Sequence, residues 1–276
     1  MSSYAEAVIS NSAASVASTA KNSRTLQMLA RLGFAVNGLL HILIAAIAIA
    51  IAVGAGSGSA DQSGALGQLA TSPGGVFVLW VVVAGLAALG LWLLLGAFLM
   101  RGADPKRQWS RRVTEVGKAV VYFLLAGTAF TFAQGGATSS AGSTRDASAS
   151  LLAAPGGVIV LLAGGLLVLA IGVYFVRKGA LQKFTADISV PSGSAGKFVL
   201  ALGIVGYVAK GIVLAVVAVL IVVAAITVDP SQSTGLDGAL RSLVALPYGG
   251  PILSALGAGL IAYGLYCFVR AWRARL

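Results

Sequence analysis

Long apolar runs alternate along this chain with short polar stretches rich in glycine and proline. Runs without any charged residue cover residues 76–100, 158–176, 212–228 and 252–269. About 20 consecutive apolar residues cross a bilayer as an α-helix. Breaks at the polar and Gly/Pro-rich stretches divide the chain into six predicted helices, at residues 29–53, 74–100, 113–133, 156–176, 197–228 and 249–269.

Composition places these helices in a membrane. Hydrophobic residues make up 58% of the 276 residues and charged residues only 10%, whereas a soluble domain carries about 25% charged residues. We therefore expect an all-α, polytopic membrane protein. The one cysteine, Cys267, lies inside an apolar run, where the expected role is that of a small packed hydrophobe.

The net charge is +11, and the Lys and Arg residues that produce it are unevenly distributed among the segments that flank and connect the predicted helices. Fifteen Lys and Arg residues lie on the N-terminal approach, on two of the loops and on the C-terminal segment, whereas only Arg145 and Arg241 lie on the other loops. The positive-inside rule then predicts a multi-pass protein of the bacterial cytoplasmic membrane with both termini in the cytoplasm. These basic cytoplasmic segments are expected to contact anionic lipid headgroups. They account for the positive net charge, so nucleic-acid binding is not needed to explain it.

The N-terminal segment lacks the features of a signal peptide, because no Lys or Arg precedes Lys21. We interpret residues 1–28 as a flexible cytoplasmic arm that is not removed.

One short sequence recurs three times. LATSPGGVFVLW, LLAAPGGVIVLL and LVALPYGGPILS begin at Leu69, Leu151 and Leu243. A shift of 82 residues carries Pro73 onto Pro155, and a shift of 174 carries it onto Pro247. The chain is therefore predicted to hold three repeats of two helices, at residues 29–103, 104–184 and 185–276. Each repeat has an even number of spans, so all three share one orientation and are expected to form a bundle with pseudo-threefold symmetry.

The recurring proline and glycines are interpreted as structural turn and packing residues. We expect a short amphipathic turn before them, the proline in the first turn of the following helix, and glycines that let the entering backbone approach its neighbour. This set comprises Pro73, Gly74, Gly75, Pro155, Gly156, Gly157, Pro247, Gly249 and Gly250.

Glycines five residues apart form a second pattern, as in the pair Gly33 and Gly38. At about 3.6 residues per turn, the two glycines lie roughly 140° apart around the helix. Each such helix can therefore let two different neighbours approach closely. The same spacing recurs at Gly85 and Gly90, Gly206 and Gly211, and Gly259 and Gly264.

These motifs together resemble a known family. G-(F/Y)-x-x-x-G in odd helices, (D/S)-G-A-L-x-x-L before the turn, P-x-G-G or P-G-G at the start of even helices, and a late Gly-x-aromatic are similar to the DUF1206 family over residues 29–275. The resemblance implies bacterial membrane proteins of three two-helix repeats whose function is uncharacterised. It also implies that the position held here by Asn37, Lys118 and Lys210 is often Arg, so this sequence departs from the family there.

Asn37, Lys118 and Lys210 occupy equivalent positions in the three odd helices. An ionisable residue within a span normally marks a pathway or a buried partner, so the three are candidate axial polar positions. The alternative is that both lysines extend to the interface, with Glu115 paired to Lys118. His41, the only histidine, is a further candidate polar residue of the first helix, although a packed or hydrogen-bonded role is favoured over a proton relay.

The sequence favours a non-catalytic accessory, scaffold or interaction protein that binds a membrane-protein partner or itself. No catalytic cluster, metal-ligand set or cofactor motif is present in the sequence, so we expect neither an enzyme nor a bound cofactor. The alternative is a small-solute or ion permease with a pathway along the pseudo-threefold axis. That alternative requires a hydrated central cavity.

Overall fold

The computed structural model describes residues 23–99 and 105–274, so residues 1–22 of the predicted arm at residues 1–28 lie outside this part. Six long helices cover the predicted spans, and each is long and apolar enough to cross a membrane. They are α2 (Arg24–Ala52), α4 (Gly75–Leu99), α5 (Pro105–Ala133), α7 (Gly157–Ala180), α8 (Gly193–Thr227) and α10 (Gly249–Arg273). The prediction of six spans is confirmed.

Three shorter α-helices and two 3-10 helices connect the spans in the described part of the chain. They are α3 (Gln62–Thr71), α6 (Ser140–Ala153), α9 (Gly235–Val244), η1 (Lys183–Asp187) and η2 (Pro230–Gln232). The expected short turns before each Pro-Gly-Gly motif are therefore full helices. The sequence signals were present, since Asp61 and Ser139 cap the N-termini of α3 and α6 through their side chains.

Several spans extend beyond the apolar runs into charged sequence. Helix α5 begins at Pro105, eight residues before the predicted start, and α10 continues through Arg270 to Arg273. Hydropathy marks only the part of a helix that lies in lipid, whereas proline fits the first helical position and basic residues stabilise a helix C-terminus. Residues 24–28 of the predicted arm are helical, because α2 begins at Arg24.

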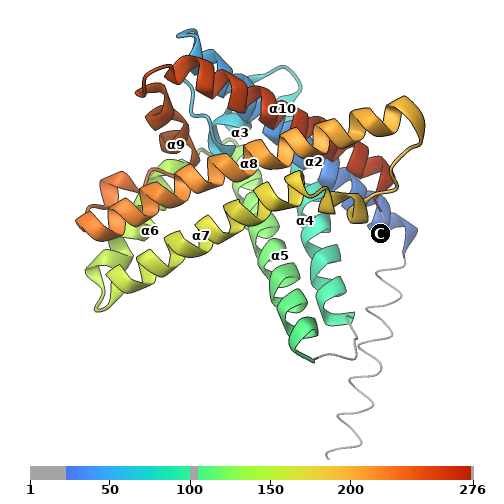
Figure 1. The fold of residues 1–276 in the computed structure, drawn as a ribbon, viewed down its shortest axis with the longest axis horizontal. Coiled ribbons are helices and arrows are strands. Elements are labelled where there is room, and N and C mark those ends of the chain that lie inside the picture. The colour runs from blue at the N-terminus through green and yellow to red at the C-terminus, as the bar shows by residue number, and fades with distance from the viewer. Residues whose placement is uncertain (1–22, 100–104, 275–276) are drawn as a thin grey trace, which may run out of the picture.

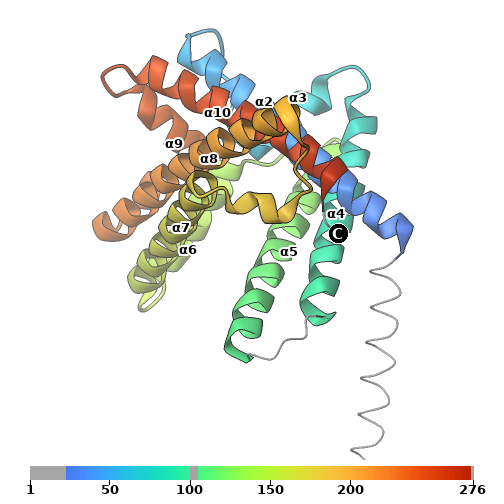
Figure 2. The ribbon, with the colours of Figure 1, turned by 45° about the vertical axis from the view of Figure 1, so that its right-hand side comes forward.

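The six spans pack in the order α5, α4, α2, α10, α8 and α7. Contacts join each helix to the next in this order, both within repeats (α2 with α4, α8 with α10) and between repeats (α4 with α5, α7 with α8, α10 with α2). We call a packed contact between two neighbouring spans a seam. A closed pseudo-threefold ring needs a sixth seam, between α5 and α7 of the second repeat. No comparable packing joins these two helices in the described part of the chain, and Figures 1 and 2 show the α4–α5 pair diverging from the α7–α8 pair.

Glycines set the closeness of the seams, as the five-residue spacing predicts. A Cβ on Gly33 would collide with the Gly85 carbonyl of α4, and a Cβ on Gly38 would lie 2.6 Å from the Gly264 carbonyl oxygen of α10. Gly206 and Gly211 likewise serve two neighbours, because they meet Tyr263 of α10 and Gly172 of α7. The prediction that a helix with such a glycine pair approaches two different partners is confirmed for α2 and α8. It is also confirmed for α4, whose Gly85 and Gly90 meet α2 and α5, and for α10, whose Gly259 and Gly264 meet α8 and α2.

Each Pro-Gly-Gly motif forms a tight turn between a short helix and a span. The amide of Gly75 donates to the Ser72 carbonyl over 2.9 Å, and Gly74 has a φ of +73°, which is the pattern of a type II turn with proline at its second position. The expectation that proline lies in the first helical turn is wrong, since α4 begins at Gly75. The second and third copies make the same turn, closed by Gly157 N to Ala154 O and Gly249 N to Leu246 O.

The two glycines of the Pro-Gly-Gly turn have different roles. The first supplies the left-handed conformation, which Tyr248 adopts in the third copy with a φ of +61°. The second permits close approach, because a Cβ on Gly75, Gly157 or Gly249 would collide with a backbone carbonyl of the preceding short helix. Gly250 lies beside α2, where a Cβ would be 3.0 Å from the Ala52 carbonyl oxygen.

The three short helices form a cap at one end of the bundle, joined by polar contacts between successive repeats. The Ser140 amide donates to the Ser63 hydroxyl over 3.1 Å, the Ser148 hydroxyl to the Ser233 hydroxyl over 2.8 Å, and the Ala60 amide to Asp237 Oδ1 over 2.7 Å. The second repeat is thus attached at the cap although its spans do not pack together. Nearby on η2, hydrogen bonds from the Ser231 hydroxyl and the Gln232 amide hold the pKa of Asp229 below its ordinary value.

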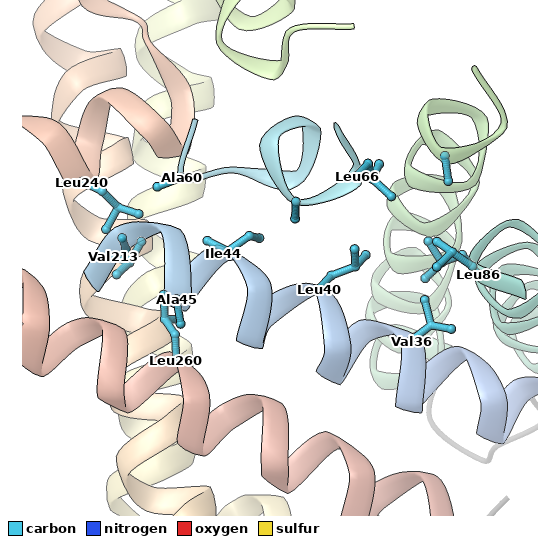
Figure 3. Close-up of a cluster of buried hydrophobic side chains, with 14 of the residues drawn as sticks. Val36, Leu40, Ile44, Ala45, Ala60, Leu66, Leu86, Val213, Leu240 and Leu260 are labelled. Carbon is cyan, nitrogen blue, oxygen red and sulfur yellow. The ribbon is translucent and has the colours of Figure 1, made fainter. Parts of the chain in front are cut away.

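The apolar core lies beneath this cap, centred on α2 (Figure 3). Leu40 and Ile44 of α2 contact a cluster that includes Leu86 of α4, Val213 of α8 and Leu260 of α10. Leu66 and Leu240 of the short helices α3 and α9 are fully buried in the same cluster. Helix α2 therefore contributes to packing on several sides, because the core surrounds it.

Candidate functional site

The first group of candidate residues lies where α2, α8 and α10 meet. Asn37 is buried, and its Nδ2 donates to Cys267 Sγ over 3.4 Å. His41 Nδ1 lies 2.7 Å from the backbone oxygen of Asn37. Because a carbonyl oxygen only accepts hydrogen bonds, this nitrogen carries the proton. The His41 ring packs 4.7 Å from the Tyr263 ring.

Lys210 of α8 belongs to the same group through its contacts with Tyr263. Its Nζ donates to the Tyr263 hydroxyl over 3.2 Å and lies 4.3 Å from the centre of that ring. Phe175 of α7 covers the ammonium group at 5.3 Å. Cation–π contact thus takes the place of a carboxylate partner, since no ion pair within 4.0 Å involves Lys210 among the described residues. Asn37, His41 and Lys210 therefore surround Tyr263 and Cys267 of α10.

Lys118 does not join this group. Its Nζ makes an ion pair with Glu115 Oε1 at 2.7 Å, and half of its side chain is exposed. It lies on α5, which borders the open side of the ring. The three equivalent positions are therefore unlike in their surroundings, because the α5–α7 seam that would enclose Lys118 is not formed.

A second group, which sequence reasoning missed, lies near the ends of α7 and α10. Lys178 Nζ contacts Asp187 Oδ2 at 2.6 Å, and Arg270 Nη2 lies 3.9 Å from the same oxygen. Aromatic rings pack around these charges: Lys178 lies 5.2 Å from the Tyr207 ring, and Arg270 lies 4.3 Å from the Phe34 ring. A signal for part of it existed, since Tyr263, Tyr266 and Arg270 recur at the spacing of one helix face.

This second group marks one end of the bundle. The chain there is held by the Ser189 amide, which donates to the Arg273 carbonyl over 3.0 Å, and by the isolated bridge between Ile188 and Ala274. Arg31 near the start of α2 donates to the Trp272 carbonyl. We call this end, with Arg31, Lys178 and Arg270, the basic end. It lies opposite the cap.

The opening between α5 and α7 has a cause in the sequence of the second repeat. The within-repeat seam of the first repeat depends on Gly33 and Gly85, and the equivalent positions of the second repeat hold Thr114 and Leu167. Both side chains are exposed. Two larger residues thus replace the two glycines at which α5 and α7 would cross. The between-repeat seam of α5 is kept, because Gly90 of α4 still packs against Ala119.

Comparison with known proteins agrees with the tripled architecture. The DUF1206 family, described as a Domain of Unknown Function, matches residues 32–99, 115–182 and 205–274. The chain belongs to the DUF1206 family. It is also 33% identical over 219 residues to the uncharacterized protein YxxB of Bacillus subtilis strain 168, which covers 76% of this chain and 78% of the relative. No solved structure matches it.

These findings establish a multi-pass, helical membrane protein with three DUF1206 repeats and assign no activity. Within the described residues, no three His, Cys, Asp or Glu side chains gather as metal ligands. Two arrangements remain that can act on other molecules: the α5–α7 opening of this DUF1206 protein and the charged group at its basic end.

Proposed function

We propose that this protein is a non-catalytic membrane interaction protein that binds a transmembrane helix of a partner protein between α5 and α7. The observation that carries the proposal is the incomplete ring, in which five seams are packed and the sixth is open. The four spans α4, α2, α10 and α8 each pack against another span on both sides, whereas α5 and α7 each do so on one side only. A partner helix in the sixth position would continue the same packing.

The walls of the opening are apolar and poorly covered. In α7 and α5, 17% and 28% of the residues in the most apolar stretch are buried, against 33 to 50% in the other four spans. Val120 and Leu124 of α5 and Leu167 of α7 are among the large exposed side chains. Lipid tails and protein compete for such surfaces, because helices in a membrane associate through close packing and not through hydrophobicity.

Small residues on these walls favour a helix as the occupant. A Cβ added to Gly117 or Gly127 of α5, or to Gly164 of α7, would meet no atom within 4 Å. Other glycines inside the spans, such as Gly38 and Gly211, are in contact with a neighbouring helix. Glycine weakens a helix by about 0.5 to 1 kcal/mol relative to alanine. The three unused glycines are therefore best explained by a helix that approaches them.

The permease alternative receives less support from the packing. It needs a hydrated pathway, whereas Leu40, Ile44 and Val213 belong to one continuous apolar cluster at the centre of the bundle. Lys210, its main selective group, is engaged by Tyr263 and Phe175.

Site-specific photo-crosslinking in native membranes tests the proposal. A photo-reactive phenylalanine derivative replaces Val120 on α5 or, as the control, Val205 on α8, which is equally exposed at 51%. The proposal expects one discrete protein adduct from position 120, absent from position 205 and lost when Gly117→Leu adds a large side chain at the position whose counterparts, Val36 and Ala209, are buried. Adducts with lipid only, with a second copy of this chain, or equally from both positions would overturn it.

For the topology, we propose a cytoplasmic membrane location with both termini in the cytoplasm. It is supported by the fifteen-to-two division of Lys and Arg between the two kinds of connection. Alkaline phosphatase fused after Leu276 should be inactive and a fluorescent protein there should be bright. The opposite pair of results would reverse the orientation.

A further inference from the structure

The basic end carries more positive charge than its own carboxylates neutralise. Lys178 and Arg270 both approach a single oxygen, Asp187 Oδ2, at 2.6 Å and 3.9 Å. One carboxylate therefore serves two cations, and Arg270 holds the longer and weaker contact. Its Nε is buried and has no hydrogen-bond partner. An arginine offers five N–H donors, so part of this donor set is unused.

The balance of charge in this group is therefore positive. Lys178 on α7 and Arg270 on α10 share the single carboxylate of Asp187, which leaves a net charge of +1. The charge of Arg270 also repels that of Lys178. Lys118 on α5 is outside this balance, because it is paired with Glu115.

The excess charge lies at the end of α7, where Lys178 is in the last turn and Leu181 is the C-cap. Large exposed side chains lie beside Lys178 on this helix, because Tyr174, one turn earlier, is 55% exposed and Leu181 is 56% exposed. Basic residues beside an exposed tyrosine are typical of the depth at which lipid headgroups lie.

We propose that the Lys178 and Arg270 side chains bind a phosphate group at the basic end. A phosphate oxygen accepts charge-assisted hydrogen bonds from lysine and arginine, and one monoanion beside Lys178 and Arg270 reduces their mutual repulsion. The phosphate belongs to an inner-leaflet phospholipid or is free in the cytoplasm. The inference rests on charge and donors at the basic end and is independent of any partner helix.

A structural role alone makes a different prediction. If Lys178 and Arg270 serve only to hold η1 through Asp187, changing Asp187 weakens the fold and affects no ligand. If they bind phosphate, Asp187→Asn removes a competing anion and strengthens binding. Asp187→Asn therefore separates the two roles by the direction of the effect on binding.

The experiment uses the full chain in nanodiscs of phosphatidylcholine with a small fraction of fluorescent phosphatidylglycerol, whose binding is followed by energy transfer from protein tryptophan. Lys178→Gln and Arg270→Gln are compared with Arg177→Gln, an exposed neighbour that loses the same charge. Each of the first two variants should bind phosphatidylglycerol about fivefold more weakly, the factor expected for one basic residue at an anionic headgroup, with Arg177→Gln unchanged and Asp187→Asn tighter. Lys178→Arg keeps the charge beside Asp187 and should bind like wild type, which keeps the test informative if Lys178→Gln does not fold.

Inorganic phosphate separates the two sources. Displacement of phosphatidylglycerol by millimolar phosphate, with the same order of variants, supports a site reached from water, and resistance to phosphate supports a lipid headgroup. Equal binding of phosphatidylglycerol and phosphatidylcholine overturns the proposal. So does an equal loss in the Lys178→Gln, Arg270→Gln and Arg177→Gln variants, because it would reflect overall charge only.

Discussion

Gly38 and Gly264 face each other where α2 crosses α10, and each makes room for the backbone of the other. A Cβ on Gly38 would lie 2.6 Å from the Gly264 carbonyl oxygen, and a Cβ on Gly264 would lie 2.7 Å from the Gly38 carbonyl oxygen. Gly211 and Gly172 repeat this reciprocal contact between α8 and α7, at 2.6 and 2.9 Å. One motif therefore builds two of the three seams between repeats.

Gly38→Ala should destabilise the protein by about 1 to 3 kcal/mol, because overpacking forces two backbones apart. Thermal unfolding in mild detergent measures the effect. Gly117→Ala is the matched control, since its Cβ meets no atom within 4 Å, and it should leave the melting temperature unchanged or raise it. Equal losses in the two variants would contradict the close crossing.

The two turn glycines should differ in their tolerance of alanine. Gly74→Ala places a side chain in the left-handed region, which costs about 1 to 2 kcal/mol, but its Cβ enters open space. Gly75→Ala should cost more, because its Cβ collides with the Leu69 carbonyl. Melting temperatures of the two variants test the order, and a larger loss for Gly74→Ala would show that conformation and not contact dominates the turn.

Restoring glycine to the second repeat should narrow the opening. The double variant Thr114→Gly and Leu167→Gly recreates the pair that closes the first repeat, so α5 and α7 should approach. Spin labels at Val121 and Ile171, both exposed, report the distance in a Cys267→Ser background. Thr128→Gly with Leu166→Gly, on the same helices, is the control for added flexibility and should not shorten the distance.

Lys210→Met should leave the fold intact. The ammonium group has a hydroxyl and two ring faces as partners, and exchanging an enclosed charge for an apolar side chain of similar length is often neutral or stabilising. Tyr263→Phe, which keeps the ring and removes the acceptor, should cost about 1 to 3 kcal/mol. Membrane conductance should be the same in wild type and Lys210→Met, and a loss in the folded variant would favour the permease.

The candidate residues show what the alignment of the repeats can predict. It shows that Asn37, Lys118 and Lys210 are at equivalent positions. Their surroundings would be equivalent only if the two spans of every repeat packed together, and those of the second repeat do not. The group at the basic end was beyond prediction for another reason. Lys178 and Asp187 are near in sequence, whereas Arg270 is far from both and reaches Asp187 only because α10 packs against α8.

The sequence by itself determined the six spans, the three repeats and the glycines at which helices cross, because hydropathy, internal shifts and residue size are properties of the chain read locally. Only the tertiary structure decided which seams form. In the sequence, Thr114 and Leu167 are ordinary residues of a membrane span. Their importance follows only from the contact between the equivalent residues of the first repeat, Gly33 and Gly85. Seam closure depends on two residues about fifty positions apart meeting at one crossing, and that meeting exists only in the folded bundle.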